Sequence, residues 1–402
     1  MNQQTIPPAT PAVLDLDPFA DDFLTDPYAA HRELRAAGPV VWLERYGVWA
    51  TGRFDEVSAV FGDAATFVSS AGVGLSDFRR DKPWRPPSLL LEADPPDHTR
   101  ARHVVTQILT PKLVRTLREG FQASADELVD TLVSRGSIDG IADLAEAYPL
   151  RVFPDFVGLP REGRENLMPY GTMVFNGFGP RNAHFENAMR DAADVGTWIA
   201  EQCRPGALTG DGLGNDIHRV AREAGYNAED SAKILRSFLS AGVDTTVHGL
   251  GNALLCLAQH PGQYAALHAN PRLARAAFEE VIRFESPVQT FFRTTDRPAT
   301  VSGVEIPAGN KILLFLGAAN RDERRWENPE SFDISRAAGG HVGFGFGIHA
   351  CLGQMLARLE GECVLSALAE RVSRIELTGE PVRKLNNTLR GLKALPLRLT
   401  AA

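Results

Sequence analysis

Apolar residues recur at spacings of three and four over most of the chain after Pro111. The stretch "KLVRTLREGFQASADELVDTLVSRG" has this pattern and ends on a glycine, which is typical of an amphipathic helix and its C-terminus. Strand-like runs are short and few: "PVVWLERYGVWATG" near residue 40 predicts a hairpin, and "ATVSGVEIPAGNKILLFLGAAN" near residues 300–320 predicts another pair of strands. The pattern therefore predicts a mainly α fold with a small β portion.

The most informative helical segment begins near Asp230 and ends at the breaker "HPG", residues 260–262. Its apolar positions follow one helical face: Leu235, Phe238, Leu239, Val243, Val247, Leu250 and Leu254. A helix of about thirty residues would be roughly 45 Å long at about 1.5 Å per residue. We expect a helix this long and this apolar to cross the middle of the fold.

Composition adds that the 402-residue chain is a globular protein, with 44% hydrophobic and 23% charged residues. A formal net charge of -8 disfavours nucleic acid as a partner, because phosphate binding needs a concentrated basic surface. The amino terminus has no basic segment followed by an apolar run, so we expect no signal peptide, no membrane anchor and a cytoplasmic location. We expect residues 1–15 to be a flexible arm and residues 16–402 to be a single domain.

A glycine-rich stretch, "FGFGIHACLG" at residues 344–353, contains one of the four cysteines. The next one, Cys363, does not give a spacing typical of a zinc site or a disulfide framework. Glycines allow positive φ and close backbone approach, and a helical segment starts just after Cys351, where the helix N-terminus favours a thiolate, the form that binds metals. Taken alone, a single cysteine can equally pack as a small hydrophobic residue.

The longer stretch "HVGFGFGIHACLG", residues 341–353, resembles the haem-binding loop of the cytochrome P450 superfamily, and the resemblance extends over nearly the whole chain. It implies the cytochrome P450 fold, with a long central helix over a buried haem b. By this resemblance Cys351 is the axial thiolate ligand of the iron, and Phe344 lies on the sulfur side of the haem. Residues 16–402 would then form one haem-thiolate monooxygenase domain.

A second motif, "FEEVIRFESP", places Glu280 and Arg283 three residues apart on one helical face. Taken alone, this spacing is that of an ordinary surface ion pair. The resemblance instead implies the buried, structural Glu-x-x-Arg pair of the family. The family often adds an arginine from a Pro-Glu-Arg-Phe segment, where this chain has Ser331, so Arg336 is the candidate for the third member.

A haem carries two propionate carboxylates, which need cations or hydrogen-bond donors when buried. The resemblance assigns this role to His98 and Arg102 in "DPPDHTRARHVV", to Arg293 in "FFRTT" and to His341 in "HVGFG". His98 and Arg102 have the i, i+4 spacing that places two side chains on one helical face. Each of the four, taken singly, is equally compatible with surface charge.

The stretch "SAGVDTTVHG" contains Asp244, Thr245 and glycines at positions 242, 249 and 251, each of which costs a helix about 1 kcal/mol. One explanation is a bent helix whose threonine hydroxyl bonds a carbonyl one turn back. The resemblance implies instead the acid–alcohol pair of the family, which relays the two protons that dioxygen cleavage requires. This favours monooxygenation with O2 as co-substrate over electron transfer or peroxide use. His248 is expected to pack or to hydrogen-bond.

Polar side chains on the same helix indicate what the pocket binds. Ser237, Ser240, Ala241, Asp244 and Thr245 share one face, and Arg236 lies beside them. On a straight helix Arg236 and Ser237 would be roughly 12 Å from Thr245, which predicts a pocket of one-ring length. Further candidate pocket residues are Arg85 and Ser88 in "KPWRPPSLLLEAD", the aromatic Phe175, Phe178 and Phe291, and Val288. The two serine and arginine clusters suggest an anion site, although each phenylalanine singly is equally an ordinary core residue.

Five less universal stretches carry a closer resemblance: "GVGLSDF", "KPWRPPS", "ADLAEAYPL", "FESPVQTFFRTT" and "NNTLRGL". They are similar to the bacterial monooxygenases that oxidise para-substituted benzoates. This implies that serine and arginine side chains hold the substrate carboxylate while the para substituent points at the haem. The expected reaction is O-demethylation of a 4-methoxybenzoate-like acid, in which the hydroxylated methyl group leaves as formaldehyde.

The chain shows no flavin or dinucleotide fingerprint, so we expect electrons from an iron-sulfur ferredoxin with its NAD(P)H-dependent reductase. Arg102, Lys112, Arg115 and Arg358 are candidates for the basic surface that meets it, and we expect a monomer. The alternatives are a haem-thiolate hydroxylase of another small molecule, a peroxide-using fatty-acid enzyme and a non-catalytic haem sensor. The peroxide-using group usually has arginine and proline where this chain has Asp244 and Thr245.

Overall fold

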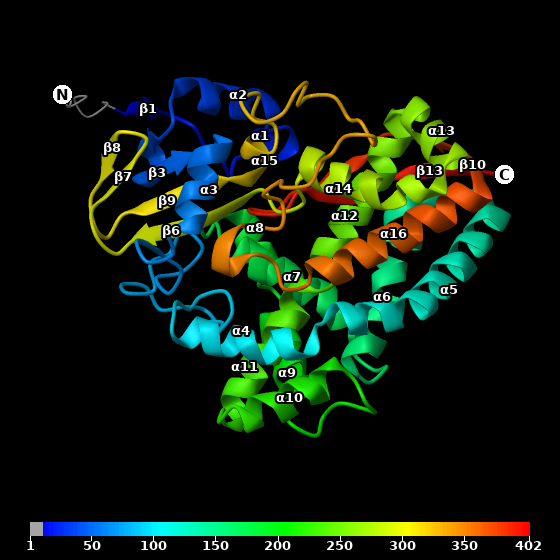
Figure 1. Cartoon of the computed structure of the whole chain (residues 1–402), viewed down its shortest axis with the longest axis horizontal. Helices are drawn as coiled ribbons and strands as arrows, with labels where there is room; N and C mark the ends of the chain where they lie inside the picture. Colours follow the sequence, from blue (N-terminus) through cyan, green and yellow to red (C-terminus); the bar gives the residue numbers. More distant parts are fainter. Residues whose placement is uncertain (1–10) are drawn as a thin grey trace.

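The computed structural model describes residues 11–402, in which helices predominate. Most of the labelled strands lie at the end of the molecule that holds the N-terminus, whereas β10 (Val372–Leu377) and β13 (Pro396–Ala401) lie at the opposite end, beside the C-terminus (Figure 1). This confirms the predicted mainly α fold with a small β portion. The α-helices are α1 (Asp21–Thr25), α2 (Tyr28–Ala37), α3 (Phe54–Gly62), α4 (Asp97–Ile108), α5 (Pro111–Arg135), α6 (Ala147–Val157), α7 (Leu167–Asn176), α8 (Ala183–Ala188), α9 (Ala192–Gln202), α10 (Leu213–Glu223), α11 (Ala228–Ala241), α12 (Asp244–Gln259), α13 (Pro261–Ala269), α14 (Ala274–Glu285), α15 (Leu316–Ala319) and α16 (Gln354–Arg371). Short 3-10 or π turns are η1 (Glu44–Tyr46), η2 (Gly140–Glu146), η3 (Arg164–Asn166), η4 (Pro271–Leu273) and η5 (Gly347–His349).

The strands form one larger sheet, in the order β1-β2-β3-β9-β6-β4, and three small ones. The large sheet contains β1 (Ala12–Leu14), β2 (Val41–Leu43), β3 (Val48–Thr51), β4 (Phe67–Val68), β6 (Thr290–Thr295) and β9 (Lys311–Phe315). The others are β5 (Ser137–Asp139), β7 (Ala299–Val301), β8 (Val304–Ile306), β10 (Val372–Leu377), β11 (Val382–Lys384), β12 (Gly391–Ala394) and β13 (Pro396–Ala401). The predicted hairpin near residue 40 is β2 and β3, and the second predicted strand region contains β7, β8 and β9.

The amino-terminal segment differs from the expected flexible arm. Strand β1 pairs in parallel with β2, with Ala12 opposite Val41 and Leu14 opposite Leu43. Since this pairing uses the backbone hydrogen-bonding groups of β1, residues 12–14 are part of the sheet. Residues 1–10 lie outside the described residues.

Helix α5 shows how local chemistry sets the limits of an element. It begins after Thr110, whose hydroxyl accepts a 3.2 Å hydrogen bond from the backbone N–H of Leu113, and Pro111 takes the first helical position. It ends at Gly136, whose φ of 71° favours glycine. Its buried face packs against α16 (Figure 1). Within residues 11–402, no helix combines the length and the apolar character needed to cross a bilayer.

The single long helix predicted from Asp230 to the "HPG" breaker is two helices, which corrects the prediction. Helix α11 ends at Ala241 and α12 begins at Asp244. Gly242 lies between them, where a Cβ would come within 2.2 Å of the ring of Phe153 on α6. The carbonyl of Ala241 accepts a 2.7 Å hydrogen bond from the Thr245 hydroxyl. The straight helix that the separation of roughly 12 Å assumed is therefore interrupted between Arg236 and Thr245.

The Glu-x-x-Arg pair forms in the core. Arg283 donates from Nε and Nη2 to the two carboxylate oxygens of Glu280 at 2.7 and 2.8 Å, and both side chains are fully buried. Arg336 donates from Nε to Glu280 at 3.1 Å. Arg336 is therefore the third member of this ion-pair network, in a chain that has Ser331 where the family often has the arginine. A buried carboxylate that receives two guanidinium groups has its charge and its lone pairs satisfied.

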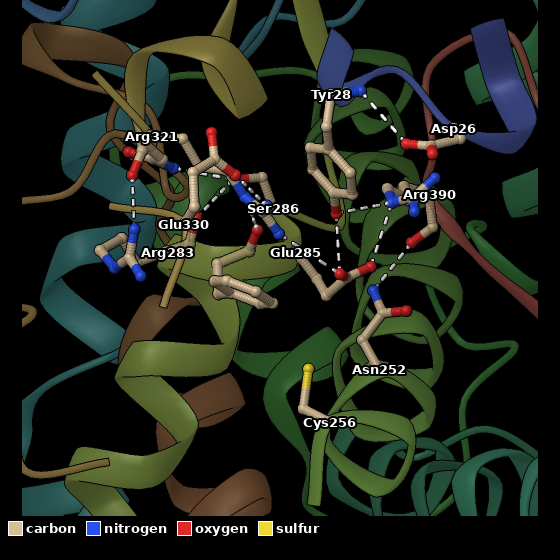
Figure 2. Close-up of polar contacts among 12 residues, drawn as sticks. Asp26, Tyr28, Asn252, Cys256, Arg283, Glu285, Ser286, Arg321, Glu330 and Arg390 are labelled. Atoms are coloured by element: carbon tan, nitrogen blue, oxygen red, sulfur yellow. Dashed lines mark hydrogen bonds and ion pairs between the residues drawn. The ribbon is translucent and has the colours of Figure 1, made fainter. Parts of the chain in front are cut away.

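A neighbouring buried network joins the two ends of the chain at Glu285, the last residue of α14 (Figure 2). Its carboxylate accepts hydrogen bonds from the Tyr28 hydroxyl at 2.7 Å and from Arg390 Nε at 3.0 Å. Burial alone raises the pKa of Glu285, but Arg390, Arg383 and Arg321 outweigh this and lower it to about 2. The network fixes the segment that follows α14 against the C-terminal loops.

Candidate active site

The cysteine of the glycine-rich loop lies in a tightly closed turn before α16. The backbone N–H of Cys351 donates to the carbonyl of Phe344 at 2.8 Å. Gly345 and Gly347 have φ values of 70° and 69°, a region that favours glycine. These two glycines therefore have the turn-forming role that the sequence predicts.

Other close approaches of this loop are to the protein itself. A Cβ on Gly343 would lie 2.7 Å from Cγ2 of Ile282 on α14, and a Cβ on Gly347 would lie 2.7 Å from the carbonyl oxygen of Phe61 on α3. Neither distance leaves space for a side chain. The loop is consequently held between α3 and α14, which fixes the position of Cys351.

Burial raises the pKa of the Cys351 thiol, and this outweighs the opposing effect of the backbone N–H groups of Gly353 and Gln354 and of the Arg102 guanidinium. The helix N-terminus alone therefore does not hold a thiolate here, although its amides contribute in the predicted direction. A bound metal cation would supply the additional stabilisation, because a thiol that coordinates a metal is deprotonated.

A cavity of about 250 Å³, called here the central cavity, has Cys351 in its wall. It brings together residues that the sequence singled out on segments far apart in the chain. The predicted site residues that line it are Arg85, Ser88, Arg102, Phe175, Phe178, Arg236, Ser237, Ser240, Ala241, Thr245, Val288, Phe291, Arg293, Phe344 and Cys351. Asp244, His98 and His341 do not line it.

Two cations of the cavity wall have no carboxylate partner among the described residues. Arg293 is buried and donates to the carbonyl of Phe292 at 2.8 Å, and Arg102 donates to the carbonyl of Ala350 at 2.8 Å. Burial lowers the pKa of Arg293 to about 10 and also lowers the pKa of Arg102. Both groups stay cationic at neutral pH, so this side of the cavity is strongly electropositive.

Two histidines lie near these arginines. The ring of His98 on α4 stacks against that of His349, with centroids 4.2 Å apart, and His349 lines the cavity. Both ring nitrogens of His98 and Nε2 of His349 are buried without a hydrogen-bond partner among residues 11–402. Burial lowers the pKa of both rings, that of His349 to about 3. Such orphaned nitrogens indicate that the site binds a polar group.

Another part of the cavity wall carries hydroxyl groups and a second arginine pair. The hydroxyls of Ser88 and Ser237 lie 2.7 Å apart, and Arg236 donates from Nη2 to the carbonyl of Pro86 at 2.6 Å. Arg85 forms a two-pronged ion pair with Glu92, at 2.9 and 3.0 Å. Arg85, a candidate for the anion site, thus lines the cavity with its charge compensated by Glu92.

The aromatic candidates Phe175, Phe178 and Phe291 form an apolar part of the cavity wall. Phe178 contacts Phe175 with ring centroids 5.7 Å apart and Phe291 at 5.8 Å. Val288 adds an aliphatic surface to the same cavity. An apolar wall with a few polar groups at one place is typical of a site for a small, flat, amphipathic ligand.

Asp244 and Thr245, at the start of α12, face different surroundings. Thr245 lines the cavity, whereas Asp244 is buried behind it. The Asp244 carboxylate lies 3.3 Å from the Thr172 hydroxyl, 3.4 Å from Lys384 Nζ and 3.3 Å from His248 Nε2. Burial lowers the pKa of His248 to about 4, so His248 is neutral near pH 7 and Lys384 is the charged partner.

Comparison with known proteins agrees with this geometry. A family model for cytochrome P450 matches residues 217–392. Cytochrome P450 CYP199A2 of Rhodopseudomonas palustris is 54% identical over 390 residues, which cover 97% of this chain and 95% of the relative. The chain belongs to the cytochrome P450 family.

Two further P450 relatives span nearly the whole chain. The cytochrome P450 monooxygenase PikC of Streptomyces venezuelae is 34% identical and covers 97% of this chain and 95% of its own. The solved structure of cytochrome P450 CREJ in complex with (4-ethylphenyl) dihydrogen phosphate is 29% identical, with a TM-score of 0.84 and coverage of 96% of this chain and 99% of that chain. This P450 is accordingly an oxidoreductase, a monooxygenase that uses haem b and O2.

The residues of the central cavity fit a haem. Cys351 would supply the axial thiolate, and Phe344 lies in the wall beside it. Arg102 and Arg293 would receive the two propionates, since both line the cavity and lack a carboxylate partner in the described part of the chain. His98 lies behind this wall, where its unpartnered ring packs against His349.

His341 is a correction to the predicted haem residues. Its Nδ1 accepts from the backbone N–H of Gly343 at 3.0 Å, and its Nε2 donates to Glu279 at 2.9 Å. With both ring nitrogens occupied and the ring outside the cavity wall, it has no donor left for a propionate. His349, eight positions later in the same loop, lines the cavity instead.

Three residues that sequence reasoning missed belong to the site. His349 lies two positions before the cysteine, and that proximity was the available signal. Glu92 and Lys384 gave no such signal, because their partners Arg85 and Asp244 are brought to them by loop and tertiary structure.

Arg358, predicted for the partner-facing surface, pairs with Glu279.

Proposed function

We propose that this P450 monooxygenase oxidises small aromatic acids, with O-demethylation of 4-methoxybenzoate-like para-substituted benzoates as its reaction. One observation carries the proposal: a single cavity is lined by Cys351, by an apolar aromatic wall, and by the Ser88–Ser237 hydroxyl pair with Arg236. A benzoate has the same division between a flat apolar ring and a charged end.

Two likenesses support this substrate class. The five stretches that resemble para-substituted-benzoate monooxygenases include "KPWRPPS", which contributes Arg85 and Ser88 to the cavity wall. CREJ was solved with (4-ethylphenyl) dihydrogen phosphate, which is itself a para-alkylated aromatic anion. Both support a pocket for a para-substituted aryl anion in this chain.

The substrate carboxylate would lie at Ser88, Ser237 and Arg236. The two hydroxyls can each turn a proton toward an anion, and Arg236 keeps donors beyond the one that binds Pro86. Ser240 and Ala241 continue the same wall toward Thr245. Holding the acid group at one end leaves the para substituent as the group presented to the haem, and positioning of this kind sets which bond reacts.

In the proposed reaction one oxygen atom of O2 enters the methyl C–H bond of the methoxy group, and the other leaves as water with two electrons and two protons. The hemiacetal then releases formaldehyde and the phenol. Haem, when bound, supplies the activation of O2. Thr245 would hold a proton at its hydroxyl in the cavity wall, and Asp244 would deliver protons from behind it.

Lys384 gives the buried Asp244 a link toward solvent. The Asp244 side chain is fully buried, whereas the Lys384 side chain is 25% exposed, and their charged atoms lie 3.4 Å apart. Lys384 would therefore keep the carboxylate in place and connect it to bulk water. It is a positioning residue in this scheme.

The electrons would come from an iron-sulfur ferredoxin and its NAD(P)H-dependent reductase, and a basic surface that includes Lys112 and Arg115 would meet the ferredoxin. Both are exposed, and Phe346 and Ile348 of the cysteine loop are also 48% and 36% exposed. Arg102 and Arg358 would contribute less, because they already bind Ala350 and Glu279. The single haem-thiolate domain over residues 16–402 and the monomeric state stay predictions.

The test is a Soret titration of the ferric holoenzyme with 4-methoxybenzoate, with its methyl ester as control. A shift from low to high spin with the acid and a much weaker response to the ester is expected. Turnover with a ferredoxin and reductase should then yield one formaldehyde per phenol. Equal responses to acid and ester, or bound acid without product, would contradict the proposal.

A further inference from the structure

A second pocket lies at the surface beside the central cavity, between the loop of residues 74–85 and the turn that joins α7 to α8. This outer pocket is lined by Gly74, Ser76, Phe78, Lys82, Pro83, Trp84, Arg85, Glu92, Gly177, Phe178, Gly179, Arg181 and Phe185. Its free volume of about 30 Å³ holds a small polar group such as a carboxylate but not a whole ring. A larger ligand would thus leave part of its body against the rim.

The lining of the outer pocket is cationic and aromatic. Lys82 and Arg181 are exposed, and no ion pair occupies either of them in residues 11–402. The Arg181 guanidinium lies 5.3 Å from the Phe185 ring centroid, and that of Arg85 lies 5.8 Å from the Trp84 ring. Glu92 is the lone acid of the lining, and Arg85 already neutralises it. The pocket is therefore complementary to an anion that carries an aromatic ring.

Arg85 and Phe178 line both the outer pocket and the central cavity. The Arg85 side chain is 11% exposed and that of Glu92 is 2% exposed, so their ion pair fills the wall between the two spaces. Glu92 is further held by the backbone N–H of Ser88 at 2.7 Å, while Nε of Arg85 is buried without a partner in the described residues. Arg85 therefore keeps one donor, Nε, that its pair with Glu92 does not use and that a second acceptor could bind.

We propose that the outer pocket is a first binding site for the aromatic carboxylate substrate, and that the Arg85–Glu92 pair is the gate between it and the central cavity. The inference rests on the proposed function, because it takes the same aromatic acids as ligand. Lys82 and Arg181 attract the carboxylate from solution, and Arg85 passes it inward toward Ser88 and Arg236. Neutral aromatic ligands gain nothing from these charges.

The test measures rates in addition to affinities. Stopped-flow mixing of ferric holoenzyme with 4-methoxybenzoate follows the Soret change, and dilution or competition gives the dissociation rate. The double variant Lys82→Gln with Arg181→Gln should lower the association rate about 3- to 10-fold at low salt and flatten its salt dependence, since rim charges act on association. The dissociation rate should fall by a similar factor, so that Kd stays within about twofold.

A matched control is the variant Arg272→Gln with Lys393→Gln, which removes the same charge from two exposed residues that line neither space. It and the methyl ester should show no comparable change in rate. The proposal is overturned if the Lys82 and Arg181 variant associates with the acid as fast as this control. If wild-type protein shows no Soret response to the acid, the proposed function fails instead.

The gate has its own test in Glu92→Gln, which keeps the size of the side chain and weakens its hold on Arg85. Association of the acid should then be faster than in wild type. Slower association in a variant with an unchanged haem spectrum would overturn the gate. Arg85→Lys gives a second measurement, because it keeps the charge but loses the two-pronged geometry, and it should also speed exchange.

Discussion

Replacing Arg236 with glutamine tests the proposed carboxylate site most directly. The variant removes a cation from the wall next to Ser237 but keeps a polar side chain of similar reach. A hydrogen bond to a charged group contributes about 1.5 to 3 kcal/mol. At 1.4 kcal/mol per factor of ten, Kd for 4-methoxybenzoate should rise about 10- to 150-fold.

The assay is the Soret titration of the ferric holoenzyme, with the methyl ester measured in parallel. Because Arg236 also binds the carbonyl of Pro86, a shifted loop would weaken acid and ester together. Arg236→Lys keeps the charge with fewer donors and should fall between wild type and the glutamine variant. Equal losses for acid and ester, or no loss for the acid, would refute the assignment of Arg236.

Other expected outcomes concern the haem, the proton route and the core. Cys351→Ala should lose the Soret signature of thiolate ligation in the ferrous carbonyl complex, and a retained signature would exclude Cys351 as ligand. Thr245→Ala should bind haem and substrate normally but divert electrons to hydrogen peroxide, measured as peroxide per NAD(P)H; full coupling would count against its role. Lys384→Met should slow turnover about 3- to 10-fold and raise the solvent isotope effect with an unchanged substrate titration; an unaltered isotope effect would argue that protons reach Asp244 by another path. Arg336→Ala should lower the free energy of unfolding by about 1 to 3 kcal/mol, because Arg283 is then the sole charged partner of Glu280 among the described residues; denaturant unfolding of the holoprotein with Arg325→Ala as exposed control measures it.

The sequence predicts the cavity wall well, because the residues fall on regular helical spacing or within short quoted motifs. Ser237, Ser240 and Thr245 needed only the 3.6-residue period and the family likeness to be placed together. The hairpins and the glycine turns could also be predicted, because each is determined by residues that are neighbours in the chain. Such features depend on neighbours in the chain, which a sequence displays.

What the sequence could not predict depends on contacts between distant segments. The bent helix offered as one explanation of "SAGVDTTVHG" forms, with the Thr245 hydroxyl bonded to the Ala241 carbonyl. The sequence could not show that the ring of Phe153, about ninety positions earlier, packs against Gly242 at this point. His341 and His349 looked alike beside the cysteine, and Glu279 on another helix decides between them. Glu92 likewise turns Arg85 from a free cation into half of an ion pair.

Because the helix is interrupted at Gly242, the proposed carboxylate-binding residues and the proposed proton-relay residues lie on two different helices. Arg236, Ser237 and Ser240 belong to α11, whereas Asp244 and Thr245 begin α12. A small tilt of α11 would alter how far an acid group sits from the haem while α12 stays fixed. Under the proposed function, we expect substitutions confined to α11 to change which acids bind while the residues of α12 that act on oxygen stay the same.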